Sequence, residues 1–147
     1  RALVENLELY ENNQRAFMRH LGEVIHYLAD YFTFPHNTIY PGNLKDHCVY
    51  EGEMKLYLRQ YLLDGRARVE QKAPVKLASL EQLYAFIQKT HDEYLQMKHS
   101  IEEDCRYIVN LCYQVVTTII ELFTANCHQA ALAQNDMLSG HLLGGTI

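Results

Sequence analysis

Eight histidines in a chain of 147 residues raise the question of metal binding. Helical di-metal sites combine Glu-x-x-His pairs on two helices with a single Glu from each of two others, all facing inward. This chain holds one such pair, Glu23 and His26. At about 100° per residue, both side chains point away from the apolar side of the expected helix, which Val24 and Leu28 mark. We therefore expect the pair on the surface, and we predict no metal and no other cofactor.

For four other histidines the sequence does not indicate a metal-ligand role. His91 falls at an apolar position of its expected helix, where a core histidine bonded to Glu, Tyr or the backbone is commoner than a metal ligand. His47, His99 and His128 have no obvious co-ligand in the sequence. Histidine content alone does not establish a metal site here.

Acidic residues gather at Asp92-Glu93 and at positions 102–104. Neighbours in sequence fan out around a helix instead of converging, so these carboxylates are expected on a solvated face rather than in an acid–base pair. The chain also lacks a glycine-rich phosphate loop and the residue patterns of Ser or Cys nucleophiles. Enzymatic activity is therefore not favoured.

Arg19 and His26 are separated by six residues and project from the same outward side of the expected first helix. In this spacing the chain resembles the HEPN-type ribonucleases, an all-helical family in which a His follows an Arg after four to six residues. The resemblance implies metal-independent RNA cleavage by Arg19 and His26, at a site that a second subunit completes. A role in a toxin–antitoxin pair belongs to the same hypothesis.

Composition indicates one globular domain over residues 1–147, since 48% of residues are hydrophobic and 21% charged. A net charge of −5 does not draw the whole molecule to nucleic acid or to an anionic membrane. Polar residues interrupt the apolar run 105–125, so we expect no membrane-spanning helix there. The chain is expected to have no membrane partner.

Four cysteines are present, and we expect them to be reduced. Cys105 and Cys112 are seven residues apart on one helix side, about 10 Å along the axis, which is too far for a disulfide. The sequence has no Cys-x-x-Cys. Buried free thiols are typical of proteins in a reducing compartment, so a cytoplasmic location is predicted.

Apolar periodicity predicts an all-α fold. Steps of four and three from Ile101 to Leu122 trace one apolar seam along a deeply buried helix. The same pattern places helices at about 3–33, 46–63 and 79–130, followed by a flexible tail at 134–147. We therefore predict an antiparallel bundle of three long helices, with the last helix packed under the first two.

The third helix has two interpretations. Ser79 and Gln82 fit a capping box at its start, and the apolar register continues through Ile101 without a slip. This continuity favours an unbroken helix. In the alternative, the chain turns near His99, a second capping box runs from Ser100 to Glu103, and the bundle has four helices.

The second helix carries more apolar surface than one neighbour can bury. Aromatic residues and Met54 form one stripe along it, and apolar residues that recur every seven positions form a second stripe. We interpret the excess as contact with another chain, and the candidate interface residues are Tyr50, Tyr57 and Tyr61. The stripe of period seven consists of Val49, Leu56 and Leu63.

Basic residues around the end of this helix, Arg59, Arg66 and Arg68, are candidates for contact with an anion or an acidic partner. Nucleic acid is a weaker alternative, because no recognition motif accompanies them.

These observations favour a non-catalytic helical module for protein–protein interaction, regulation or assembly, which pairs with a second copy of itself as a homodimer. Two alternatives remain open at this point. One is the HEPN-like ribonuclease. The other is a small-ligand sensor with a pocket among the three interface tyrosines and His91.

Overall fold

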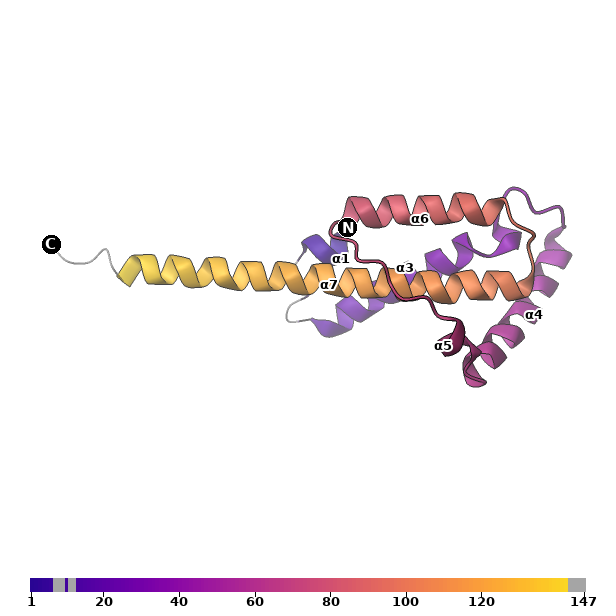
Figure 1. Ribbon diagram of the computed structural model, residues 1–147, viewed down its shortest axis with the longest axis horizontal. Coiled ribbons are helices and arrows are strands. Elements are labelled where there is room, and N and C mark those ends of the chain that lie inside the picture. The colour runs from indigo at the N-terminus through magenta and orange to yellow at the C-terminus, as the bar shows by residue number, and fades with distance from the viewer. Residues whose placement is uncertain (7–9, 11–12, 143–147) are drawn as a thin grey trace.

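The computed structural model describes residues 1–6, 10 and 13–142, with side chains through 135. Within these residues all regular structure is helical and no strand occurs, which confirms the all-α class. The antiparallel bundle of three long helices is not what forms. Shorter helices surround one end of a single long helix, as Figure 1 shows.

The longest helix, α7, spans Ile101–Leu142 and contributes the centre of the core. The seam predicted from the sequence is confirmed at Cys105, Ile108, Val115 and Ile119, which are all buried. The helix does not end near residue 130, because 129–134 is rich in Ala, Leu and Gln, which favour helix. Its C-terminal part extends past the other helices (Figure 1).

Helix α6 (Leu80–Leu95) runs back along α7, and the chain turns between them at 96–100. The prediction of one unbroken helix over 79–130 is therefore wrong, and the turn near His99 is correct. The Ser100 hydroxyl accepts the backbone N–H of Glu103 at 3.2 Å, which caps α7. The predicted apolar register of α6 is buried at His91 and Tyr94, whereas Tyr84 of the same register is 68% exposed.

The first predicted helix, 3–33, is also divided. Helix α1 covers Ala2–Glu5 and α3 covers Gln14–Tyr31. The Asn13 side chain accepts the backbone N–H of Ala16 at 3.1 Å, so this residue starts α3 instead of continuing a helix. Residues 7–9 and 11–12 of the prediction lie outside the described part of the chain.

A short 3-10 helix, η1 (Phe34–His36), leads to α4 (Leu44–Leu63). Asn43 and Asp46 form a reciprocal capping box at the start of α4. Helix α4 lies across the beginning of α7, and the small helix α5 (Arg66–Glu70) follows it (Figure 1).

The aromatic stripe of α4 and its stripe of residues seven apart face opposite sides of the helix. Met54 packs against the core and Tyr61 is buried. Val49, Leu56 and Leu63 are 52%, 69% and 72% exposed. Contact of this outer stripe with a second copy of the chain stays a prediction.

Helix α7 has the composition of a membrane-crossing helix over Ile101–Asn135, with a mean hydropathy of 1.5 in its most apolar window. Core helices share this composition, and 33% of that window is buried within the molecule. One helix of this kind is weak evidence for a membrane, and the expectation of no membrane partner stays a prediction.

Candidate metal centre

Three side chains converge where η1 meets the first turns of α4. They are His36, His47 and Glu51, and their donor atoms all lie within 4.8 Å of one another. The Nε2 atoms of His36 and His47 are 2.9 Å and 3.0 Å from the same oxygen, Oε1 of Glu51. Among the described residues this is the one group of three such side chains close enough to share a metal ion.

Local structure places each donor. His47 and Glu51 are four residues apart on α4, so their side chains lie on one helix face, one turn apart. Pro35 is the second residue of η1, and its ring fixes the backbone that turns His36 toward α4. The backbone N–H of His36 donates to the carbonyl of Thr33 at 3.0 Å, which closes this turn.

The electrostatics of the group favour an ionised carboxylate. Hydrogen bonds from His36 and then His47 lower the pKa of Glu51 below its ordinary value, against a smaller opposing effect of burial. The side chains of His36, His47 and Glu51 are 31%, 25% and 43% exposed, so solvent and a ligand can reach the group.

A completely buried carboxylate lies beneath this region. Asp104 of α7 accepts hydrogen bonds from the backbone N–H of Phe34 and from the hydroxyls of Tyr50 and Tyr94. Burial raises the pKa of Asp104 above its ordinary value, and the three hydrogen bonds oppose that rise. The carboxylate therefore links η1, α4 and α6 to α7.

The donor set of two imidazoles and one carboxylate is one that catalytic zinc sites use, with a further position left for water or substrate. Zinc–ligand bonds of roughly 2.0–2.1 Å place tetrahedral ligands roughly 3.3 Å apart. The observed separations from Glu51 to the two imidazoles are a few tenths of an ångström shorter. Small side-chain rotations would therefore admit the ion, and the residues fit zinc.

A family model for zinc-dependent phospholipase C matches residues 1–101 of the 147. The matched stretch includes all three donor residues and ends at the first residue of α7. The chain belongs to the zinc-dependent phospholipase C family. No curated protein and no solved structure matched the chain.

Membership of the zinc-dependent phospholipase C family overturns the function predicted from the sequence. The family match indicates an enzyme, which contradicts the non-catalytic interaction or regulatory module. It equally contradicts the metal-independent ribonuclease and the small-ligand sensor. Zinc-dependent phospholipases C are typically secreted, so the match does not support the predicted cytoplasmic location.

The pair proposed for RNA cleavage, Arg19 and His26, is not assembled as a site. Both residues are exposed on α3. Arg19 Nη2 lies 3.3 Å from the ring of the adjacent His20, and His26 Nε2 lies 3.5 Å from Oδ2 of Asp30. His26 and Asp30 are donor types that zinc also accepts, although the described residues offer no third ligand beside them.

The predicted interface tyrosines make contacts within the chain. Tyr50 donates to Asp104, and buried Tyr61 donates to Glu70 at 2.9 Å. Arg66 is bound to Asp64 and donates to the Tyr57 hydroxyl at 3.0 Å.

Of the three predicted basic contact residues, Arg66 is half-buried, while Arg59 and Arg68 are exposed. A partner or anion at these residues stays a prediction. Contact with nucleic acid at these residues also stays a prediction.

His91 is a core histidine, in agreement with the sequence analysis. Its ring is buried and stacks on Tyr31 at 3.6 Å between centroids, and Nε2 lies 3.0 Å from Oδ1 of Asn37. Burial lowers its pKa below the ordinary value, so the neutral ring is favoured. A backbone group of Tyr31 bonds the ring, as expected, and the Asn37 amide is a further partner that the sequence did not indicate.

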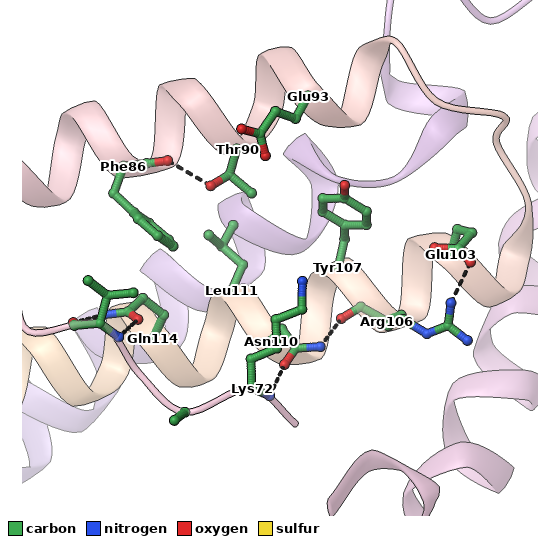
Figure 2. A pocket seen from close by; sticks show the side chains of 12 residues that line it. Lys72, Phe86, Thr90, Glu93, Glu103, Arg106, Tyr107, Asn110, Leu111 and Gln114 are labelled. Carbon is green, nitrogen blue, oxygen red and sulfur yellow. Dashed lines mark hydrogen bonds and ion pairs between the residues drawn. The ribbon is translucent and has the colours of Figure 1, made fainter. Parts of the chain in front are cut away.

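A cavity of about 460 Å³ lies between α6, α7 and the extended segment 71–78. Phe86 and Leu111 give it an apolar wall, and Lys72, Glu93 and Arg106 lie around it (Figure 2). None of the metal-centre donors and none of the tyrosines expected to form a sensor pocket lines this cavity. It is separate from the metal centre.

His36, His47 and Glu51 were not predicted as metal ligands from the sequence. The expected spacing was Glu-x-x-His, whereas the helical pair here is His47 followed by Glu51 four residues later. That spacing puts two donors on one helix face and was the available signal. The third donor, His36, comes from a separate turn, and only the packing of η1 against α4 brings it near.

Proposed function

We propose that this chain carries a zinc-binding site of a phospholipase C, formed by His36, His47 and Glu51. The reaction class is hydrolysis of the phosphodiester bond between the glycerol oxygen and the phosphorus of a phospholipid. The products are a diacylglycerol and a phosphorylated headgroup. The observation that supports this proposal is a zinc-type donor cluster inside the residues that the family model matches.

Zinc, when bound, neutralises charge on the phosphate oxygens and makes water a stronger nucleophile at neutral pH. The residues of the chain have defined parts in this arrangement. His36 and His47 would offer imidazole nitrogens as ligands, and Glu51 would supply one negative charge. Because the Glu51 pKa is low, this carboxylate stays ionised at neutral pH without a proton to displace.

The position of the cluster suits a headgroup substrate. The three ligands are partly exposed at the junction of η1 and α4, so a phosphate on a lipid headgroup can approach from solvent. With three protein donors, a zinc ion held here would keep a position for water or a phosphate oxygen.

The test is release of phosphorylated headgroup from phosphatidylcholine in mixed detergent micelles. The parent chain should be active with zinc, lose activity with EDTA and regain it when zinc is restored. His47→Ala should lower activity by more than the roughly 10–100-fold that loss of an outer metal-site partner costs. His128→Ala is the matched control, because it removes an exposed histidine from the far part of α7.

Two outcomes would contradict the proposal. One is hydrolysis that is unaffected by EDTA. The other is equal activity in the His47→Ala and His128→Ala variants, which would place the reaction elsewhere.

A further inference from the structure

Asp104 differs from the metal-centre donors in its place along the chain. It lies on α7, beyond residues 1–101 that the family model matches, and it is completely buried. A buried carboxylate is costly unless hydrogen bonds satisfy it. Here three donors from three other parts of the fold do so, at 2.8 to 2.9 Å.

Two of these donors come from the elements that hold the metal ligands. The Phe34 N–H lies two residues before His36 in η1, and the Tyr50 hydroxyl belongs to α4, between His47 and Glu51 in sequence. Both donate to the same atom, Oδ2 of Asp104, at 2.8 Å and 2.9 Å. One oxygen therefore ties η1 to α4.

The third donor is the Tyr94 hydroxyl, which donates to the other oxygen, Oδ1, at 2.8 Å. Tyr94 belongs to α6, and α6 carries none of the three ligands. The two oxygens of one carboxylate thus have separate roles. Oδ2 holds the two elements of the metal centre, and Oδ1 holds the α6–α7 turn.

We infer that Asp104 is a positioning residue of the zinc site, with its Oδ2 setting the distance between His36 on η1 and the pair His47 and Glu51 on α4. This inference rests on the proposed function. Metal sites depend on groups outside the ligand set that orient the ligands, and loss of such a group typically costs about 10–100-fold in metal affinity. Asp104 performs this task by holding the backbone and helix that carry the ligands, without contact to the ion.

The arrangement allows a test that separates positioning from simple stability. Tyr50→Phe removes a bond to Oδ2, and Tyr94→Phe removes the bond to Oδ1. Each variant loses one hydroxyl on the same carboxylate. Tyr50→Phe should weaken zinc binding at least about tenfold, measured by competition with a chelating dye. Tyr94→Phe should bind zinc within about twofold of the parent, because the Oδ2 bonds remain.

Asp104→Asn supplies the conservative variant. Its amide oxygen can accept the bonds from Phe34 and Tyr50, and its NH₂ can donate to the Tyr94 hydroxyl. It should retain most of the zinc affinity, whereas Asp104→Ala should lose at least about tenfold. The d–d absorption of bound Co²⁺, used in place of zinc, should change shape in Tyr50→Phe and Asp104→Ala and stay parental in Tyr94→Phe.

The outcomes distinguish this inference from the proposed function. If the parent chain binds neither zinc nor Co²⁺, the proposed site itself fails. If the parent binds zinc, but Tyr50→Phe and Tyr94→Phe show equal affinities and equal Co²⁺ spectra, the positioning role of Asp104 is wrong while the site stands. Circular dichroism of each variant confirms that the helices are retained.

Discussion

The side-chain amide of Gln114 on α7 pairs with both backbone polar groups of Val75, as a neighbouring strand would. Its Oε1 accepts the Val75 N–H at 2.6 Å, and its Nε2 donates to the Val75 carbonyl at 2.8 Å. This buried side chain holds the extended segment 71–78 against α7 at Val75, along the wall of the cavity in Figure 2, and Asn110 holds it at Lys72, whose N–H donates to Oδ1 at 2.8 Å.

Gln114→Ala should loosen this segment around Val75. Loss of the two hydrogen bonds to Val75 and of the one to Thr118 should lower the free energy of unfolding by roughly 1–3 kcal/mol. Amide hydrogen exchange at Val75 should accelerate, while exchange in the middle of α6 should change only as global stability does. Gln129→Ala, at an exposed position of the same helix, is the control. Unchanged exchange at Val75 would show that the amide does not hold the segment.

The cysteines should differ in reactivity. Burial raises the pKa of Cys105 to about 12 and that of Cys112 to about 11, whereas Cys48 is exposed. Since the thiolate is the reactive form, iodoacetamide at mildly alkaline pH should modify Cys48 long before Cys105 or Cys112 in the folded chain. Mass spectrometry of the digested protein measures this order. Equal rates at Cys48 and Cys105 would mean that α7 is not buried as described.

All four cysteines are free, as the sequence predicted. The expectation that they are buried holds for Cys105 and is wrong for Cys48, which lies on the outer side of α4. A free thiol is compatible with several compartments, so this result does not establish a cytoplasmic location.

The stability of the metal-free chain at acid pH tests the pairing of Glu51 with His36 and His47. Because the pKa of Glu51 is lowered, its hydrogen bonds to the two histidines stabilise the fold at pH values above the ordinary Glu pKa of 4.5. That contribution is lost as the pH falls through the lowered pKa. The difference in unfolding free energy between the parent and Glu51→Gln should therefore shrink below that pH.

Urea unfolding at a series of pH values measures this difference. Glu53→Gln is the control, because Glu53 is exposed on the same helix and makes no ion pair with His36 or His47. If the stability of Glu51→Gln paralleled the parent throughout the acid range, the two histidines would not hold that carboxylate in solution.

The Ser100 cap at the α6–α7 turn can be tested by substitution. Ser100→Ala removes the hydroxyl that accepts the Glu103 N–H, and it should lower the unfolding free energy by about 1 kcal/mol. If residues 79–130 formed one helix, the same substitution would be neutral or stabilising, since Ala favours a helix interior. Thermal unfolding of the variant and the parent shows whether the substitution lowers or raises the free energy of unfolding.

The sequence was sufficient for the buried seam of α7, because apolar residues at a period of 3.5, here Cys105, Ile108, Val115 and Ile119, are typical of one buried helix face. It was also sufficient for the Ser79 cap, since the Ser79 hydroxyl accepts the Gln82 N–H at 3.3 Å at the start of α6. It was insufficient for the turn at 96–100, which contains no Gly or Pro. That turn is stabilised by tertiary contacts, among them the bond from Tyr94 to Asp104 and the stacking of His99 on Phe34, which local propensity does not report.

The metal centre shows the same limit. The His47–Glu51 spacing on α4 was visible in the sequence, but two donors do not make a zinc site. The third donor depends on η1 folding back to α4, and Asp104 helps to hold it there from a position 70 residues beyond Phe34. Contacts at such separation follow from packing and not from a local pattern.

X-ray absorption at the zinc edge tests the central claim most directly. The chain is loaded with one equivalent of zinc, and the fine structure is compared between the parent and His47→Ala. We expect nitrogen and oxygen ligands at roughly 2.0–2.1 Å, with the scattering of two imidazoles in the parent and of one fewer in the variant. Sulfur ligands at roughly 2.3 Å, or a spectrum that His47→Ala leaves unchanged, would contradict a zinc site at His36, His47 and Glu51.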